Sequence, residues 1–201
     1  RTLNRISVDS DQSTSDTVLA FASGRKGPVT DEELSAAFLT VLGGLAGDIV
    51  RNGEGTGHVI RVSVSGAADE SLAAAVGKAV VNSPLVKTAV HGNDPNVGRI
   101  VSSIGDFAGN AGVALDPRAV TVRMGGLEIF SGGCFRLDAD KEARLSAYLR
   151  GCGWQPGAKG FPAHDRCVDI DVALGGGSAA VEILGSDLSA EYVRENADYR
   201  S

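Results

Sequence analysis

The stretch IVRNGEGTGHVIRVSVSG, residues 49–66, joins two different patterns of hydrophobicity. Up to its first residue, apolar side chains recur at the spacing of one helix face: Leu34, Phe38, Val41, Leu45 and Ile49. From residue 58 to residue 65, apolar and polar residues alternate, as they do in a half-buried strand. The stretch therefore predicts a helix, a glycine-rich loop and a strand in immediate succession.

Glu54 lies in this loop between Gly53 and Gly55. Glycine permits tight turns and lets a ligand approach the backbone closely. A carboxylate at the entrance of a strand is well placed to pair with an ammonium group of a ligand. The alternative is an acidic residue that is simply solvated in a turn, and the residue pattern alone leaves both interpretations open.

Helix and strand signals alternate along the rest of the chain as well. Thr30, followed by Glu33, predicts a capping box at the start of the first long helix. The other predicted elements are strands over 6–8 and 17–22, a helix over 69–82, a strand within 83–92, a helix after the turn at 93–96, a hairpin around 125–126, a helix over 138–150, and two strands around 175–177 before a short last helix. This mixture predicts an α/β or α+β fold with a division near residue 113.

The composition argues against several classes of protein. The 201 residues are 43% hydrophobic and 22% charged, which is typical of a globular chain. The net charge of −6 makes nucleic acid or an anionic lipid surface a poor partner. No apolar run reaches the roughly 18 residues of a spanning helix, so we expect no membrane span. Residue 1 is arginine and Met124 is the only methionine, so we expect a fragment or a processed product.

The cysteines and histidines form no recognisable motif. The three cysteines include no CxxC pair, and only one histidine lies near a cysteine in sequence: the residues are Cys134, Cys152, Cys167, His58, His91 and His164. This spacing predicts no metal site and favours reduced thiols in a cytoplasmic protein. A cysteine and a histidine could still act together as nucleophile and base, although no histidine lies in a motif for that chemistry.

Four stretches together are similar to one known family. They are LNRISVDSDQSTSDT (3–17), NGEGTGHVIRVSVSGA (52–67), VNSPLVKTAVHGNDPNVGRI (81–100) and SAEYVRENADYRS (189–201). They resemble, in the same order, segments of the ornithine acetyltransferases, which are also called bifunctional glutamate N-acetyltransferases. The matches extend over nearly the whole chain, and SPLVKTA and DPN-x-GRI are the most specific of them.

The resemblance implies a self-cleaving enzyme. The family precursor cuts itself before a threonine, which becomes the N-terminal nucleophile of the second chain. Its own α-amine can serve as the base, and the acetyl group moves from N-acetylornithine to glutamate through an acetyl-threonine in a ping-pong mechanism. The resemblance also implies an αββα sandwich of the N-terminal-nucleophile type, formed by residues 1–112 and 181–201, with a smaller α/β lobe at 113–180.

The same resemblance implies particular partners and site residues. We expect an N-terminal (alpha) chain from the same precursor, small amino-acid substrates, a higher oligomer, a cytoplasmic location and no cofactor. Thr2 does not correspond to the nucleophile, because RTLNR resembles a segment downstream of the cut, so no catalytic residue is expected in this chain. Substrate contacts are implied for Glu54, Asn196 and Ser201.

Several residues depart from the family pattern. GTGH, ending at His58, stands where GATK is usual, and Val97 stands where the family has tryptophan. A paralogue with a changed acyl donor or acceptor is therefore one alternative. An amidase or aminopeptidase on the same scaffold is a second alternative, because water can attack an acyl-enzyme in place of an amine. A non-catalytic binding or regulatory subunit is a third.

Overall fold

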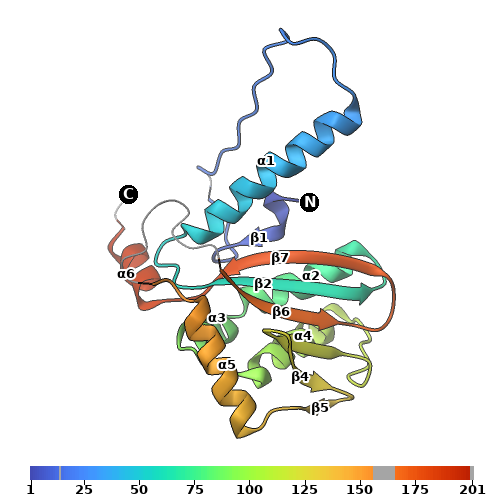
Figure 1. Ribbon diagram of the computed structural model, residues 1–201, viewed down its shortest axis with the longest axis vertical. Helices are drawn as coiled ribbons and strands as arrows, with labels where there is room; N and C mark the ends of the chain where they lie inside the picture. Colours follow the sequence, from blue (N-terminus) through green and yellow to red (C-terminus); the bar gives the residue numbers. More distant parts are fainter. Residues whose placement is uncertain (14, 156–165, 200–201) are drawn as a thin grey trace.

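A computed structural model describes residues 1–13, 15–155 and 166–199 (Figure 1). Seven strands form one sheet in the order β1-β7-β2-β6-β3-β4-β5. The strands are β1 (Ile6–Ser7), β2 (Val59–Ala67), β3 (Thr121–Met124), β4 (Leu127–Ser131), β5 (Cys134–Phe135), β6 (Cys167–Ala173) and β7 (Ala179–Ser186). The helices are α1 (Asp31–Arg51), α2 (Glu70–Asn82), α3 (Pro84–His91), α4 (Val97–Ala111), α5 (Ala139–Cys152) and α6 (Ala190–Asp198). The predicted α/β class is confirmed.

Strand β2 is the centre of the sheet. It pairs in parallel with β6, from Val59 opposite Cys167 to Ser65 opposite Ala173, and antiparallel with β7 on its other side. Its apolar side chains are buried, and helix α2 packs on β2 and β7. The helix begins at the cap Asp69, whose carboxylate accepts a hydrogen bond from the Leu72 amide.

The sheet runs across the boundary predicted near residue 113. Strand β6, expected in the smaller lobe, pairs with β2, which was expected in the sandwich. One hydrophobic core also contains residues from both parts, including Ile60, Ile183 and Met124. The division into lobes stays a prediction, and the described residues contain this one sheet.

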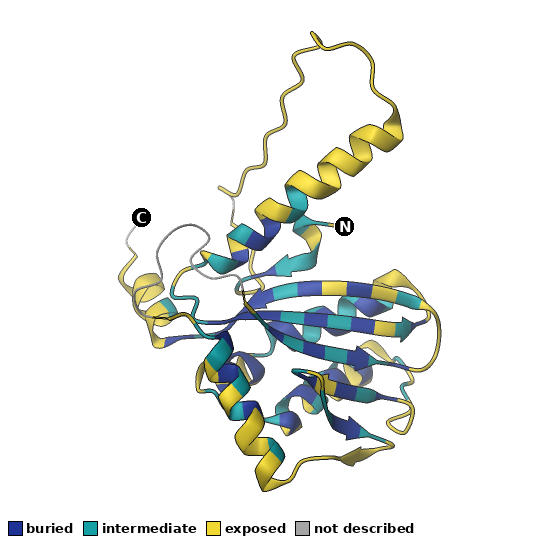
Figure 2. Ribbon diagram, viewed as in Figure 1, coloured by how far each residue is buried: buried dark blue, intermediate teal, exposed yellow. Residues whose placement is uncertain are grey.

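Helix α1 begins with the predicted capping box. Thr30 Oγ1 accepts from the Glu33 amide at 3.2 Å, and Glu33 Oε2 accepts from the Thr30 amide at 3.0 Å. The helix and the segment before it extend away from the sheet, and Figure 2 shows most of the helix exposed. Its exposed apolar residues include Phe38, Val41 and Leu45, at 43%, 59% and 51% exposure. The apolar residues predicted on one helix face therefore do not reach the core.

The expectation that no segment could span a membrane needs a correction at helix α1. This helix has 21 residues and a mean hydropathy of 1.5 in its most apolar window, so by length and composition alone it could cross a membrane. Every window of 18 residues in this helix includes the charged Asp48, so the helix contains no unbroken apolar run of that length. Length and composition are weak evidence for a span, because a helix of a water-soluble protein passes the same test.

Two predicted strands are wrong. Residues 84–91 form helix α3, because Ser83 caps its start and Pro84 takes the first helical position, where a missing amide costs nothing. Residues 17–22 have no regular secondary structure and are exposed, with Phe21 at 90%. The residues of that segment favour a strand locally, but the segment neither pairs with another strand nor is buried, so no strand forms.

Most other predicted elements are confirmed. Helix α2 and the helix after the turn at 93–96 form as expected, and so does the hairpin of β3 and β4. Gly125 and Gly126 of its turn have φ angles of 54° and 77°, which glycine adopts at little cost. Helix α5 is capped by Asp138 and extends two residues beyond the predicted end, to Cys152.

The contact between α2 and the sheet yields a stability prediction. A Cβ on Gly77 would come 2.6 Å from Ile183 Cγ1, so we expect Gly77→Ala to destabilise the protein by about 1–3 kcal/mol through overpacking. The control is Gly105→Ala on α4, where a Cβ meets nothing within 4 Å, so this change should be neutral or stabilising by up to ~1 kcal/mol. Urea unfolding of the full protein measures both. Equal midpoints for the two variants would contradict the packing argument.

Candidate functional site

The loop that carries Glu54 rests against the first turn of α6. Gly55 has a φ of 63°, and a Cβ there would come 2.4 Å from the Tyr192 amide nitrogen and 2.6 Å from Ser189 Oγ. Ser189 is the cap of α6, because its hydroxyl accepts from the Tyr192 amide at 3.0 Å. Only glycine permits both this backbone conformation and this close approach. The loop and α6 therefore meet at the end of the sheet where β2 begins (Figure 1).

Carboxylates gather around Tyr192. Its hydroxyl donates to Asp9 Oδ2 at 2.9 Å. Burial raises the pKa of Tyr192 to about 12, and the negative charges of Asp9, Asp11 and Glu54 add to the shift. The Glu54 carboxylate is therefore close enough to affect this phenol. A region with three carboxylates favours a cationic group over an anionic one.

Of the other two predicted substrate contacts, the structure describes Asn196 but not Ser201. Asn196 lies one turn after Tyr192 on α6, is exposed, and donates from Nδ2 to the Tyr192 carbonyl at 3.0 Å. The helix that carries Asn196 therefore touches the loop that carries Glu54. Ser201 lies outside the described residues.

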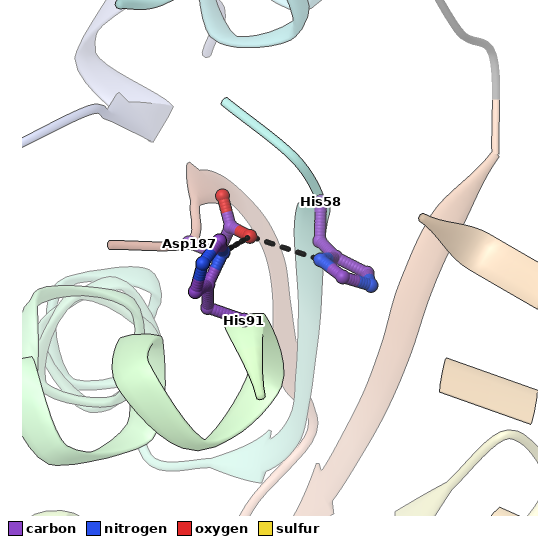
Figure 3. A group of neighbouring side chains, drawn as sticks. All are labelled: His58, His91 and Asp187. Carbon is purple, nitrogen blue, oxygen red and sulfur yellow. Dashed lines mark hydrogen bonds and ion pairs between the residues drawn. The ribbon is translucent and has the colours of Figure 1, made fainter. Parts of the chain in front are cut away.

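A buried carboxylate lies behind the loop. Asp187 follows β7, and its side chain is fully buried. Its Oδ1 accepts from the Gly57 amide at 2.9 Å, and its Oδ2 lies 2.9 Å from His58 Nδ1 and 3.1 Å from His91 Nδ1 (Figure 3). Burial opposes the charged form, but hydrogen bonds from His58 and Gly57 outweigh it and hold the pKa of Asp187 below its usual value.

No sequence motif predicts this group, because its three members are far apart along the chain. One ring nitrogen of His58, one of His91 and an oxygen of Asp187 lie within 4.8 Å of one another, and these atom types can hold a metal ion. The described polar contacts of the two histidine rings go to Asp187 and to the Leu149 carbonyl, so they provide no cysteine–histidine pair. His164 lies outside the described residues.

Comparisons with known proteins agree over the whole chain. A family model described as the ArgJ family matches residues 1–201. The chain is 40% identical over 201 residues to glutamate N-acetyltransferase Oat2 of Streptomyces clavuligerus, covering 99% of this chain and 47% of that protein. It is 40% identical over 205 residues to the arginine biosynthesis bifunctional protein ArgJ of Nitratidesulfovibrio vulgaris, covering 100% and 47%. The chain thus spans about half the length of these curated relatives.

A solved structure is also similar. The crystal structure of arginine biosynthesis bifunctional protein ArgJ from Bacillus halodurans matches with a TM-score of 0.82 and 33% sequence identity. The match covers 98% of this chain and 87% of the crystallised chain, so those two chains are close in length.

The contact between the loop and α6 can be tested directly. We expect Gly55→Ala to displace α6, because the added Cβ would overlap the Tyr192 backbone. Amide hydrogen exchange over 190–198 should then accelerate at least about tenfold, which corresponds to roughly 1.4 kcal/mol of lost protection, while exchange in β2 stays slow. Gly92→Ala is the control, since a Cβ there has only ordinary contacts at 3.5 and 3.6 Å. Unchanged exchange in α6 of the Gly55 variant would refute the contact.

Proposed function

This chain belongs to the ArgJ family, and we propose that it is the C-terminal part of a self-cleaving acetyltransferase that moves acetyl from N-acetylornithine to glutamate. The match over residues 1–201 carries the proposal, together with the names of the relatives. The crystallised ArgJ chain is similar in length to this chain, and both are about half as long as the curated relatives. This similarity supports the proposal that the protein consists of two chains.

The proposed reaction has two balanced steps. A threonine hydroxyl from a segment outside these 201 residues attacks the acetyl carbonyl, the C–N bond breaks, and ornithine leaves with the hydroxyl proton on its amine. The amine of glutamate then attacks the acetyl-threonine ester, the C–O bond breaks, and the threonine hydroxyl re-forms. No residue of this chain is assigned the nucleophilic role. Its part in the reaction is to bind the substrate.

We place the side-chain ammonium of the ornithine substrate near Glu54. This carboxylate is exposed on a loop whose glycine neighbours let a ligand approach, and the charges around Tyr192 favour a cation. Asn196 on the adjoining helix supplies an amide for a second polar contact. Ser201 is proposed as a third contact through its hydroxyl.

The exposed apolar face of α1 is the proposed docking surface for the N-terminal chain of the same precursor. Phe38, Val41, Leu45 and Ile49 are 43–59% exposed, although they recur at the spacing of a buried helix face. About half of the relatives' length lies outside this chain, and that portion is the proposed occupant. Assembly of such pairs into a higher oligomer, in the cytoplasm, is part of the proposal.

The substrates are tested with the complete two-chain protein. N-acetylornithine and isotope-labelled glutamate are supplied, and mass spectrometry is used to look for labelled N-acetylglutamate and free ornithine. Formation of both supports the transferase. Free acetate in place of N-acetylglutamate would identify an amidohydrolase on the same scaffold. A changed donor or acceptor, as GTGH and Val97 suggest for a paralogue, would show as no product from this pair and turnover of another acylated amino acid.

We expect Glu54→Gln to raise KM for N-acetylornithine by at least about tenfold, because one charged hydrogen bond is worth roughly 1.5–3 kcal/mol. The rate constant kcat should change less than KM. Glu142→Gln is the matched control, since Glu142 is an exposed glutamate in the first turn of α5. Steady-state kinetics of both variants measure this, and an unaltered KM for the Glu54 variant would remove Glu54 from the site.

The docking surface predicts an assembly defect. We expect Phe38→Asp to reduce co-elution of this chain with the N-terminal chain on size exclusion, because a charge would be buried in an apolar contact. Leu85→Asp on α3 is the control, since Leu85 is 59% exposed and lies away from α1. Equal co-elution of the two variants would place the partner elsewhere.

A further inference from the structure

Three side chains from three separate elements converge on one point. His58 precedes β2, His91 is the last residue of α3, and Asp187 follows β7. Figure 3 shows both imidazole rings directed at the same carboxylate oxygen. Asp187 Oδ2 is 2.9 Å from His58 Nδ1 and 3.1 Å from His91 Nδ1.

The contact of the second ring nitrogen of His58 determines whether a cation must lie between His58 and Asp187. His58 Nε2 lies 3.2 Å from the Leu149 carbonyl oxygen, which can only accept, so this contact is a hydrogen bond when Nε2 carries a hydrogen. In the neutral ring, Nδ1 then presents a lone pair to an oxygen of a carboxylate 2.9 Å away. Two acceptors at this distance require a cation between them. A second proton on the ring satisfies the requirement, and so does a metal ion.

We propose that His58 Nδ1, His91 Nδ1 and Asp187 Oδ2 bind one divalent transition-metal ion of the Zn²⁺ class. Two imidazoles and a carboxylate are a frequent donor set for zinc and its neighbours. Tetrahedral ligands about 2.0–2.1 Å from Zn²⁺ lie roughly 3.3–3.4 Å from one another, so the two oxygen–nitrogen distances need to open by a few tenths of an ångström. The two imidazole nitrogens, which lie within 4.8 Å of each other, need to reach the same separation.

Two of the three ligands, His58 and Asp187, have a further hydrogen-bond partner that fixes their orientation. The Leu149 carbonyl holds His58 in the tautomer that frees Nδ1 for a metal. The Gly57 amide holds the other oxygen of Asp187 at 2.9 Å and so orients the carboxylate. His58 and Asp187 are buried, whereas the His91 side chain is 43% exposed, so an ion and a water ligand would reach the group from the side of His91.

One neighbouring charge opposes the metal. Lys87 lies near Asp187, and burial lowers its pKa to about 8. Its ammonium donates to the carbonyls of Val8 and Ser186, so the opposing charge acts at a distance and does not occupy Oδ2. We therefore expect weaker binding than at a closed structural zinc site. The ion would fasten the loop that ends at His58 to α3 and to the segment that leads into α6.

The site is tested on the complete two-chain protein, purified without a histidine tag. Co²⁺ is titrated as the probe, and the visible absorption of a low-symmetry four-coordinate ion is recorded. Elemental analysis after gel filtration then measures retained Zn²⁺. The expected result is one Co²⁺ per chain and one Zn²⁺ retained. No spectrum and no retained zinc would show that protons alone hold the cluster, and would overturn the proposal.

Variants separate metal binding from folding. His91→Phe removes one ligand and keeps the buried pair of His58 and Asp187, and we expect Co²⁺ binding to weaken at least a hundredfold. His58→Lys places a positive charge beside Asp187 but replaces the imidazole with an ammonium, which is a poor metal ligand. This variant should fold and should lack the Co²⁺ spectrum. Asp140→Asn, at an exposed carboxylate on α5, is the control and should bind normally. Binding by His91→Phe equal to that of the control would also overturn the proposal. None of these readouts depends on acetyl transfer.

Discussion

The pairing of β2 on both edges is the constraint on which the rest of the molecule depends. Its parallel partner β6 and its antiparallel partner β7 come from distant parts of the chain, and both lie beside it along most of its length. A strand buried in this way cannot slip by one residue, because every side chain would change faces. The loop before β2 and the segment after β7 therefore meet at the same end of the sheet.

The buried Asp187 carboxylate then connects these segments. Its oxygens contact the backbone before β2, the ring of His58 and the ring of His91, and its amide donates to the His58 carbonyl at 3.0 Å. A buried charge is tolerated only when its lone pairs are satisfied, and this one has partners on both oxygens. The geometry of the glycine-rich loop is thus held by polar contacts beneath it and by the close approach of α6 beside it.

Two surfaces of the molecule differ in character. Around Tyr192 the side chains are acidic and polar, which suits a small cationic ligand. Along α1 the exposed side chains are apolar, and together they form a surface of the kind that a protein partner covers (Figure 2). In the proposed enzyme the first surface serves the substrate and the second serves assembly. Helix α1 provides the second surface, and the loop that follows it brings Glu54 to the first.

Residues near in sequence determined much of this protein. Capping residues such as Thr30 and Asp138, the alternation in β2 and the paired glycines at 125–126 act over a few positions, so the chain alone predicted these elements and the α/β class. The motifs likewise identified the family. Propensity failed at 84–91, where a cap and a proline outweighed β-type residues, and at 17–22, where no strand pairs. Only the tertiary structure decided that α1 exposes its apolar face, that the loop of Glu54 touches α6, and that His58, His91 and Asp187 meet. Those facts depend on contacts between residues as far apart in the chain as Gly55 and Tyr192, and nothing in the local pattern encodes them.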